Sequence, residues 1–211
     1  MKKRVSLLLA LGLIAALVLG GCGKKDDSAS LVGEWQATLE MADTLNESLA
    51  SDPTMADYIN IDSFAMKMDL SLRDDGTFTL ALNEASVTEA FEGIKAPLKD
   101  GITAYMEASL EGTGMSVEDA LAASGMDIDS MMDSMLSPEM ITASLGDATE
   151  SGSFVAKDGK LYFLDEGETK PGDDSAAMPY TLSGSKLTLD KPSSGDVGDL
   201  AEFFPMEFAK K

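Results

Sequence analysis

The residues that most often perform catalysis near neutral pH are scarce in this sequence. There is no histidine among the 211 residues, and Cys22 is the single cysteine. A Cys-His or Ser-His-Asp site is therefore excluded, and no nucleophile elbow, phosphate-binding glycine loop or dinucleotide fingerprint occurs. Two carboxylates could hydrolyse a glycoside, but with 37 acidic residues such pairs arise by chance. We expect a protein that is not an enzyme and needs no cofactor, and an acid-dependent hydrolase is the least favoured function.

Three aspartates in the middle of the chain have a spacing that resembles the start of a calcium loop. They are Asp127, Asp129 and Asp133. An EF-hand loop needs an oxygen ligand at its fifth position and glycine at its sixth. This sequence has Met131 and Met132 there, so we expect no metal and interpret the aspartates as a helix cap followed by an acidic helix face.

Methionine is unusually frequent, with 14 in the chain. The run Met131-Met132-x-x-Met135 could bind Cu(I) through soft thioethers. An adaptable apolar surface is the favoured interpretation, because methionine is common at such surfaces and the other extracellular copper ligands are missing. The methionines of the central region are Met106, Met115, Met126, Met131, Met132, Met135 and Met140.

The first 21 residues have the pattern of a secretory signal. Lys2, Lys3 and Arg4 precede an apolar run at 5–19, which is about 15 residues and shorter than the ~20 of a membrane-spanning helix. Leu19-Gly20-Gly21-Cys22 resembles the lipobox of bacterial lipoproteins. The resemblance implies cleavage before Cys22, a diacylglycerol on its thiol and a further acyl chain, such as palmitate, on its new N-terminus. The alternative is an uncleaved anchor helix with a chance cysteine.

The mature chain is strongly acidic. Residues 22–211 contain 13 basic and 37 acidic residues, a net charge of −24. Such a surface repels nucleic acid, so we expect no nucleic-acid partner. We expect the protein to attach to the membrane only through lipid on Cys22. Residues 22–30 are predicted to form a flexible tether, and their composition resembles that of Gram-positive lipoproteins. We therefore expect the protein to be located at the extracytoplasmic face of the cell membrane.

Alternation of apolar and polar residues predicts strands on both sides of a central helical region. A period of two residues is typical of a half-buried strand, and two such runs joined by a glycine-containing turn predict a hairpin. These patterns predict a strand at 31–41, hairpins at 66–82, 154–164 and 180–189, and a last strand within 203–208 that Pro205 interrupts.

Apolar residues recur every three or four positions over 84–146, which predicts a helical insertion. Pro97 and Gly101 are expected to break or kink its first helix, and another short helix is predicted at 42–50. The expected helix caps and ends are Ser116, Gly125, Asp127, Ser137 with Pro138, and Gly146.

These elements predict one domain over 31–211, mainly β with an α insertion. Sequential hairpins favour an antiparallel meander that closes into a barrel, because closure removes exposed strand edges. The helical insertion at about 84–146 is expected between strands three and four.

Gly33-Glu34-Trp35 opens the first predicted strand and resembles the Gly-x-Trp motif of lipocalins and related calycin barrels. The resemblance implies a lipocalin-like barrel in which Trp35 lies beneath a basic residue near the last strand, either Lys210 or Lys211. The later hairpins also resemble bacterial lipocalin-like lipoproteins. Trp35 can equally be a core aromatic at a strand start.

Two functions follow from this fold. A barrel of eight strands could hold one small apolar or amphiphilic ligand, or be filled by its own side chains. Alternatively, the protein is a non-catalytic envelope protein whose Met-rich insertion meets a partner. The inward-facing candidates for ligand contact are Trp35, Met68, Leu70, Phe78 and Leu80.

Overall fold

The structure is a computed structural model that describes residues 27–51, 56–123, 125, 127–137, 149–172, 175–192 and 201–211. The predicted signal, Cys22 and the helix expected between Pro138 and Gly146 lie outside these ranges. Among the described residues, no helix combines the length and apolar character needed to span a membrane.

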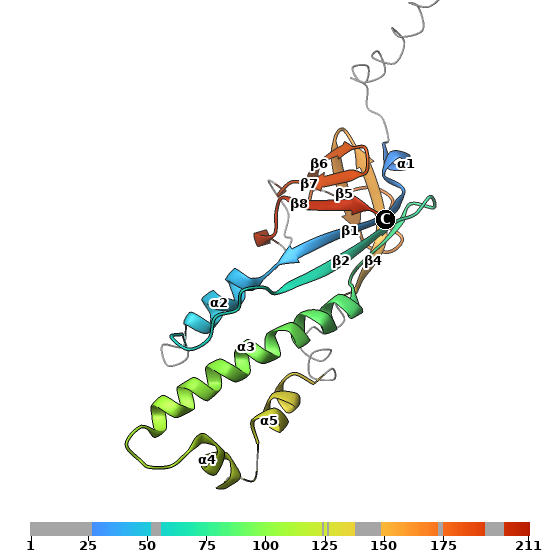
Figure 1. Ribbon diagram of the computed structural model, residues 1–211. Coiled ribbons are helices and arrows are strands. Elements are labelled where there is room, and N and C mark those ends of the chain that lie inside the picture. The colour runs from blue at the N-terminus through green and yellow to red at the C-terminus, as the bar shows by residue number, and fades with distance from the viewer. Residues whose placement is uncertain are drawn as a thin grey trace, which may run out of the picture.

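Eight antiparallel strands form a closed barrel in sequence order, as the alternating pattern predicts (Figure 1). The three predicted hairpins are confirmed. The first and last strands pair through Trp35–Lys210, Gln36–Ala209 and Ala37–Phe208, which closes the barrel. The strands are β1 (Gly33–Glu40), β2 (Ala65–Leu72), β3 (Thr77–Leu82), β4 (Thr149–Lys157), β5 (Lys160–Leu164), β6 (Met178–Ser183), β7 (Lys186–Leu189) and β8 (Met206–Lys210).

Inward-facing side chains of the strands form one continuous cluster inside the barrel, which we call the barrel cluster. In β1, for example, every second side chain from Trp35 to Leu39 is buried. The buried members are Leu31, Trp35, Ala37, Leu39, Met68, Leu70, Leu72, Phe78, Leu80, Phe154, Ala156, Leu161, Met178, Leu187, Leu189, Met206 and Phe208.

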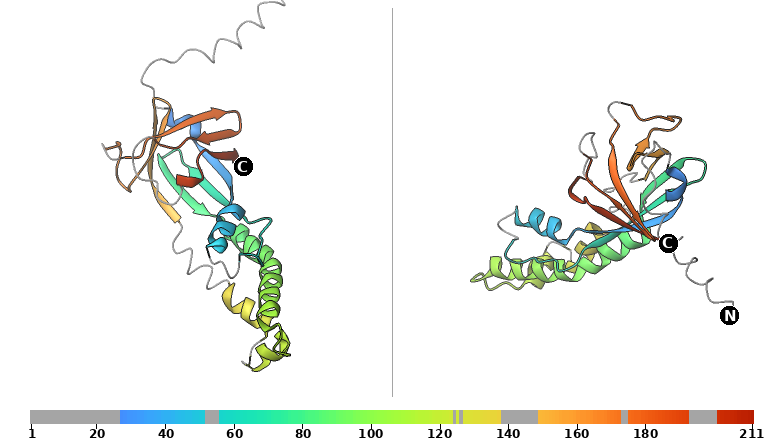
Figure 2. Two further views of the ribbon diagram at one scale, coloured as in Figure 1. Left: turned by 90° about the vertical axis from the view of Figure 1, so that its left-hand side faces the viewer. Right: turned by 90° about the horizontal axis from the view of Figure 1, so that it is seen from above.

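The helices lie mainly to one side of the barrel and form an elongated arm (Figures 1 and 2). We use "arm" for α2 (Ala42–Ala50), residues 56–64, α3 (Glu84–Leu110), α4 (Val117–Ala123) and α5 (Ile128–Met135). α2 follows β1 directly, and the other three helices lie between β3 and β4 in the chain. The short helix predicted at 42–50 and the caps at Ser116 and Asp127 are confirmed.

The arm has a buried core of its own. Its members come from 59–64, from the start of β2 and from α3, and they are Ile59, Ile61, Phe64, Met66, Val87 and Ile94. Asn46 of α2 holds the 56–64 segment in place, because its amide donates to the Ile61 carbonyl and its side-chain oxygen accepts from the Ile61 N–H. Met41 and Leu82 pack against both this core and the barrel cluster, so the two cores are continuous.

Of the predicted break or kink at Pro97 and Gly101, the break is wrong. α3 is one helix of 27 residues that includes both. Gly101 serves packing instead, because a Cβ at this position would lie 2.6 Å from the carbonyl oxygen of Tyr58 and would also collide with Ile59. Burial of the α3 face against residues 58–59 stabilises the helix across these unfavourable residues.

Two predicted boundaries also differ from the structure. The sequence predicts a flexible tether over 22–30, but Ser28–Leu31 form the short helix α1, and the Asp27 N–H donates to the Ala156 carbonyl at 2.9 Å. Asp27 and α1 thus pack against the barrel. The last strand starts at Met206, after Pro205, rather than at Phe203.

Candidate functional site

The five predicted ligand-contact residues all lie in the barrel cluster. Trp35, Met68, Leu70, Phe78 and Leu80 are each at most 6% exposed. The structure therefore brings them together on the inner face of β1, β2 and β3, in contact with neighbouring buried side chains. In this arrangement the inner face of the barrel is a packed core, and a ligand would have to displace side chains to enter it.

Leu31 and Lys210 both contact the Trp35 side chain. Its Nε1 donates a hydrogen bond of 2.8 Å to the Leu31 carbonyl, and Lys210 Nζ lies 5.2 Å from the indole centroid. Lys210 also donates to the Val32 carbonyl at 3.4 Å. Gly33 allows this approach, because its φ of +150° favours glycine and a Cβ there would lie 2.9 Å from Lys210 Cε. Of the two basic residues considered for this position, Lys210 is the one that lies over Trp35.

The other candidate, Lys211, contributes to a polar cluster that sequence reasoning missed. Its Nζ lies 2.7 Å from Asp69 Oδ1, and the side-chain amides of Gln36 and Asn83 donate to the same carboxylate. Partial burial acts to raise the pKa of Asp69, but the hydrogen bonds from Lys211, Asn83 and Gln36, together with the Lys211 charge, outweigh it and hold that pKa below its usual value. Because Asn83 also caps α3, this cluster links the barrel to the arm.

The junction between β5 and β6 has the shortest ladder in the barrel. It contains two residue pairs, Lys160–Pro179 and Leu161–Met178, whereas the other seven junctions contain three to eight. Tyr162, Phe163 and Leu164 pair with β4 but have no partner in β6.

A pocket of about 400 Å³ lies beside this junction, open to solvent. Phe163 lines it and also stacks on Phe78 of the barrel cluster, with ring centroids 4.5 Å apart. The Phe163 side chain thus contacts both the pocket and the barrel cluster. The remaining lining residues are Leu164, Asp165, Glu168, Lys170, Gly172 and Ser175, and none of the seven was among the predicted site residues. One feature of the sequence indicates this pocket: Phe163 lies near the end of a predicted strand and is followed by a charged segment.

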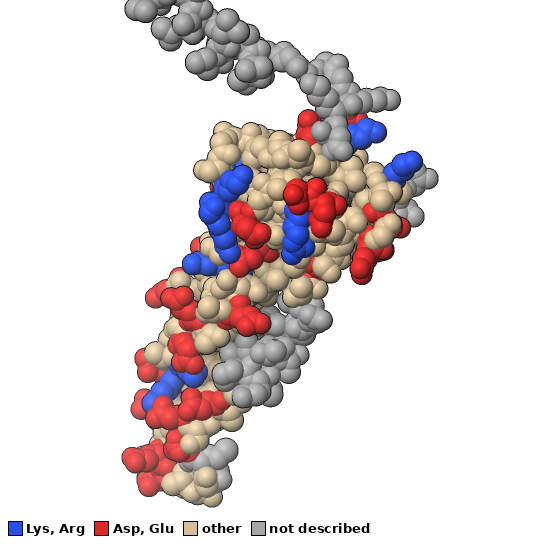
Figure 3. Space-filling view, turned by 90° about the vertical axis from the view of Figure 1, so that its right-hand side faces the viewer, with Lys and Arg blue, Asp and Glu red and all other residues tan. Residues whose placement is uncertain are grey.

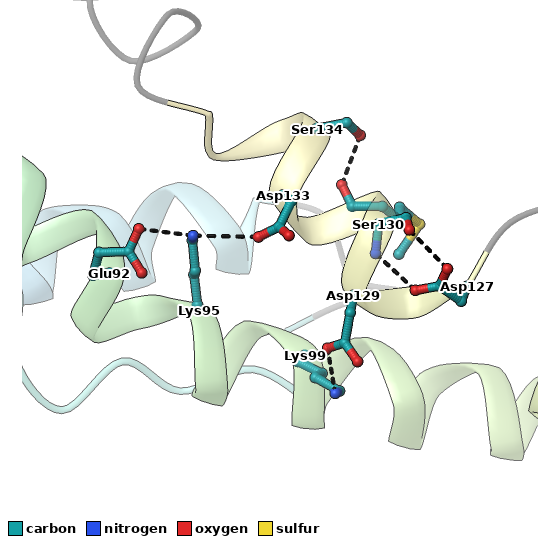
Figure 4. Close-up of polar contacts among 9 residues, drawn as sticks. Glu92, Lys95, Lys99, Asp127, Asp129, Ser130, Asp133 and Ser134 are labelled. Carbon is teal, nitrogen blue, oxygen red and sulfur yellow. Dashed lines mark hydrogen bonds and ion pairs between the residues drawn. The ribbon is translucent and has the colours of Figure 1, made fainter.

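The aspartates and methionines of α5 serve packing and capping in the structure (Figure 4). Asp127 accepts hydrogen bonds from the Ser130 N–H and hydroxyl, as a helix cap does. Asp129 pairs with Lys99, and Asp133 lies 3.4 Å from Lys95 of α3. Met132 is buried and Met131 is half-buried, while the side chain of Met135 lies outside the described set. No group of three or more acidic or cysteine side chains in the described ranges could hold a metal ion.

The arm carries much of the negative charge. Residues 84–135 contain 11 acidic residues and only two basic ones, Lys95 and Lys99. Both lysines are paired with acidic side chains, since Lys95 also contacts Glu92 at 2.7 Å. Figure 3 shows acidic side chains spread along this part of the molecule on one face. The arm is thus strongly acidic, and Lys95 and Lys99 already form ion pairs within it.

Comparison with known proteins adds no functional assignment, because no family model, curated protein or solved structure matches the chain.

Proposed function

We propose that this protein is a non-catalytic lipoprotein that binds a small apolar or amphiphilic ligand in a lipocalin-like barrel. The observation that carries the proposal is the contact of Phe163 with both the open pocket and the barrel cluster. Through this contact, a side chain that lines the pocket touches the buried Phe78, close to the barrel's shortest ladder. A closed barrel of eight strands is wide enough for one small ligand if the interior side chains rearrange.

The composition of the barrel cluster supports such a rearrangement. Met68, Met178 and Met206 are members of the cluster. Methionine has an unbranched, flexible side chain that fills irregular space and tolerates repacking. An apolar ligand can therefore bind in the barrel when the methionine side chains change rotamer, with little movement of the strands.

The arrangement around Trp35 supports the lipocalin-like part of the proposal. The family resemblance implies a basic side chain above this tryptophan, and Lys210 occupies that position. Gly33 permits the close approach. The Gly-x-Trp motif therefore has a physical role here, although any barrel could bury a tryptophan at a strand start.

Membrane attachment is part of the same proposal and rests on the lipobox-like sequence before Cys22. The protein would act at the extracytoplasmic face of the cell membrane, in a Gram-positive envelope. Expression of the full chain in a Gram-positive host with an alkyne-labelled fatty acid should label the wild-type protein. Cys22→Ser should abolish the label, whereas a label that persists in Cys22→Ser would contradict lipid on this cysteine.

Ligand binding can be tested by native mass spectrometry of the purified full chain carrying Cys22→Ser. The proposal predicts a fraction of protein with an extra non-covalent mass that is lost on gentle activation. A protein that remains empty after incubation with envelope lipid extract would contradict ligand binding.

A second candidate function is partner recognition by the arm, with the barrel as a rigid platform. The observation that favours it is the buried core of the arm, which supports an acidic surface that extends away from the barrel. Crosslinking in intact membranes should then trap one defined neighbour, and deletion of residues 112–145 should abolish capture while the barrel remains folded. Unchanged capture in the deletion variant would exclude residues 112–145 as the binding surface.

A further inference from the structure

The junction between β5 and β6 has the features of an entrance to the barrel. Its ladder stops after Leu161–Met178, so separation of these strands beyond that pair breaks no ladder hydrogen bonds between them. Entry between any other pair of neighbouring strands would break a longer ladder. At the end where β1 leaves the barrel, Met41 and Leu82 pack against the arm's core and cover part of the interior.

Phe163 is the side chain that an entering molecule would displace. It is half-buried, lines the pocket and stacks at a tilt of 43° on Phe78, which is 4% exposed. Rotation of the Phe163 ring would connect the pocket to the apolar surface of the barrel cluster. An apolar chain in its place would contact Phe78 and so recover the buried contact that the ring had made.

The rim of the pocket carries charges of both signs. Asp165, Glu168 and Lys170 are exposed and line it. In the part of the chain that the structure describes, no ion pair joins Lys170 to either acid. Charges of both signs therefore lie on one rim, as a ligand that presents both an ammonium and an anionic group requires.

We propose that this pocket is the head-group site of a zwitterionic amphiphile whose apolar tail enters the barrel between β5 and β6 past Phe163. This inference rests on the proposed binding function and specifies its entrance and ligand class. A singly charged anionic amphiphile would be disfavoured, because the mature chain carries a net charge of −24. A cationic one would leave Lys170 facing a like charge.

The single tryptophan of the chain supplies a direct readout. Trp35 is a member of the barrel cluster, so a brominated alkyl tail should quench its fluorescence only after entering the interior. We suggest titrating the full chain carrying Cys22→Ser with monomeric brominated dodecylphosphocholine. Brominated dodecyl sulfate and brominated dodecyltrimethylammonium, with the same tail, are the comparison probes.

The inference predicts saturable quenching with the zwitterionic probe at lower concentration than with either singly charged probe. Lys170→Gln and Glu168→Gln should each weaken binding by about threefold, the effect of an exposed charge pair. Their matched controls, Lys157→Gln and Glu166→Gln, change exposed residues that do not line the pocket and should bind as wild type. Phe163→Ala should accelerate quenching.

The outcomes separate this inference from the broader proposal. Quenching that is indifferent to head group, to Lys170→Gln, to Glu168→Gln and to Phe163→Ala would overturn the entrance while leaving barrel binding intact. Absence of quenching by all three probes would overturn barrel binding itself. Because the charge variants alter exposed side chains, unchanged Trp35 emission before titration will show that the fold is preserved.

Discussion

Lys211, the last residue of the chain, lies with its Nζ 2.7 Å from Oδ1 of Asp69 in β2. Asp69 also accepts from Asn83, the cap of α3, and from Gln36 of β1. One carboxylate therefore joins the C-terminus, the first two strands and the longest helix. Its effect on stability can be measured, because its pKa is held low in the folded protein.

We expect stability to fall in acid partly through Asp69. A lowered pKa in the folded state means that Asp69 contributes stability above its unfolded pKa, which is near 3.8. This contribution is lost as the pH falls through the folded value. Denaturant unfolding from pH 7 to 2 should show a smaller loss of stability in Asp69→Asn than in wild type.

Glu40→Gln is the control for this measurement, because Glu40 is exposed at the end of β1. Its pH dependence should match that of wild type. Equal acid sensitivity in Asp69→Asn and wild type would show that the Asp69 cluster does not stabilise the fold.

Gly101→Ala should destabilise the protein even though alanine favours helices. The new methyl group would collide with Ile59 and with the Tyr58 carbonyl, and overpacking of this kind costs about 1–3 kcal/mol. Gly93→Ala is a matched control in the same helix with open space around its Cβ, and it should gain about 1 kcal/mol. Thermal unfolding of both variants tests the pair; a stabilised Gly101→Ala would contradict the packing of α3 on residues 58–59.

Lys210→Ala should change the environment of Trp35 without unfolding the barrel. Loss of the cation above the indole removes a contribution of about 0.5–1 kcal/mol and opens the ring to water. We therefore expect a red shift of Trp35 emission and a small fall in stability. Lys186→Ala, which removes a surface pair with Glu207, should leave the emission unchanged. A Lys210→Ala spectrum identical to wild type would show that the two side chains do not interact in solution.

The attachment of α5 to α3 should weaken with salt. Its ion pairs, Lys99–Asp129 and Lys95–Asp133, are exposed and hence screened. Hydrogen exchange of α5 amides should accelerate at high ionic strength, while amides of β1 and β2 should not respond. The double variant Asp129→Asn with Asp133→Asn should exchange rapidly at all salt concentrations. Salt-independent exchange in wild type would indicate that Met132 burial alone holds α5.

High pH should release the same helix. Hydrogen bonding to Glu92 raises the pKa of Lys95 against some desolvation, and hydrogen bonding to Asp129 raises that of Lys99. Groups with raised folded pKa values stabilise below their unfolded pKa, near 10.5, and lose that effect as the pH rises through the folded value. Hydrogen exchange of the α5 amides should therefore accelerate above about pH 10.5 by more than the intrinsic exchange rate of an unprotected amide does.

The sequence predicted the barrel well because strand and turn signals are local. Alternation in β1 and β2 and the Asp-Gly turns specify which faces are buried and where the chain reverses. Gly101 could not be assigned correctly, because its role depends on a segment some 40 residues earlier in the chain. The Asp69 cluster and the short β5–β6 ladder likewise depend on which strands become neighbours, and the sequence pattern carries no direct signal for ladder length.

The docking of Asp27 and Ser28 onto β4 restricts where the protein can stand relative to a membrane. Asp27 N–H and Ser28 Oγ bond to the backbone of Ala156, so the chain leaves the barrel at a fixed point, at the end away from the arm (Figure 1). If lipid is attached at Cys22, five residue steps of at most about 3.5 Å each separate the bilayer surface from that point. The barrel would then stand within roughly 20 Å of the lipid head groups, with its acidic helices directed outward, where anionic lipid repels them least.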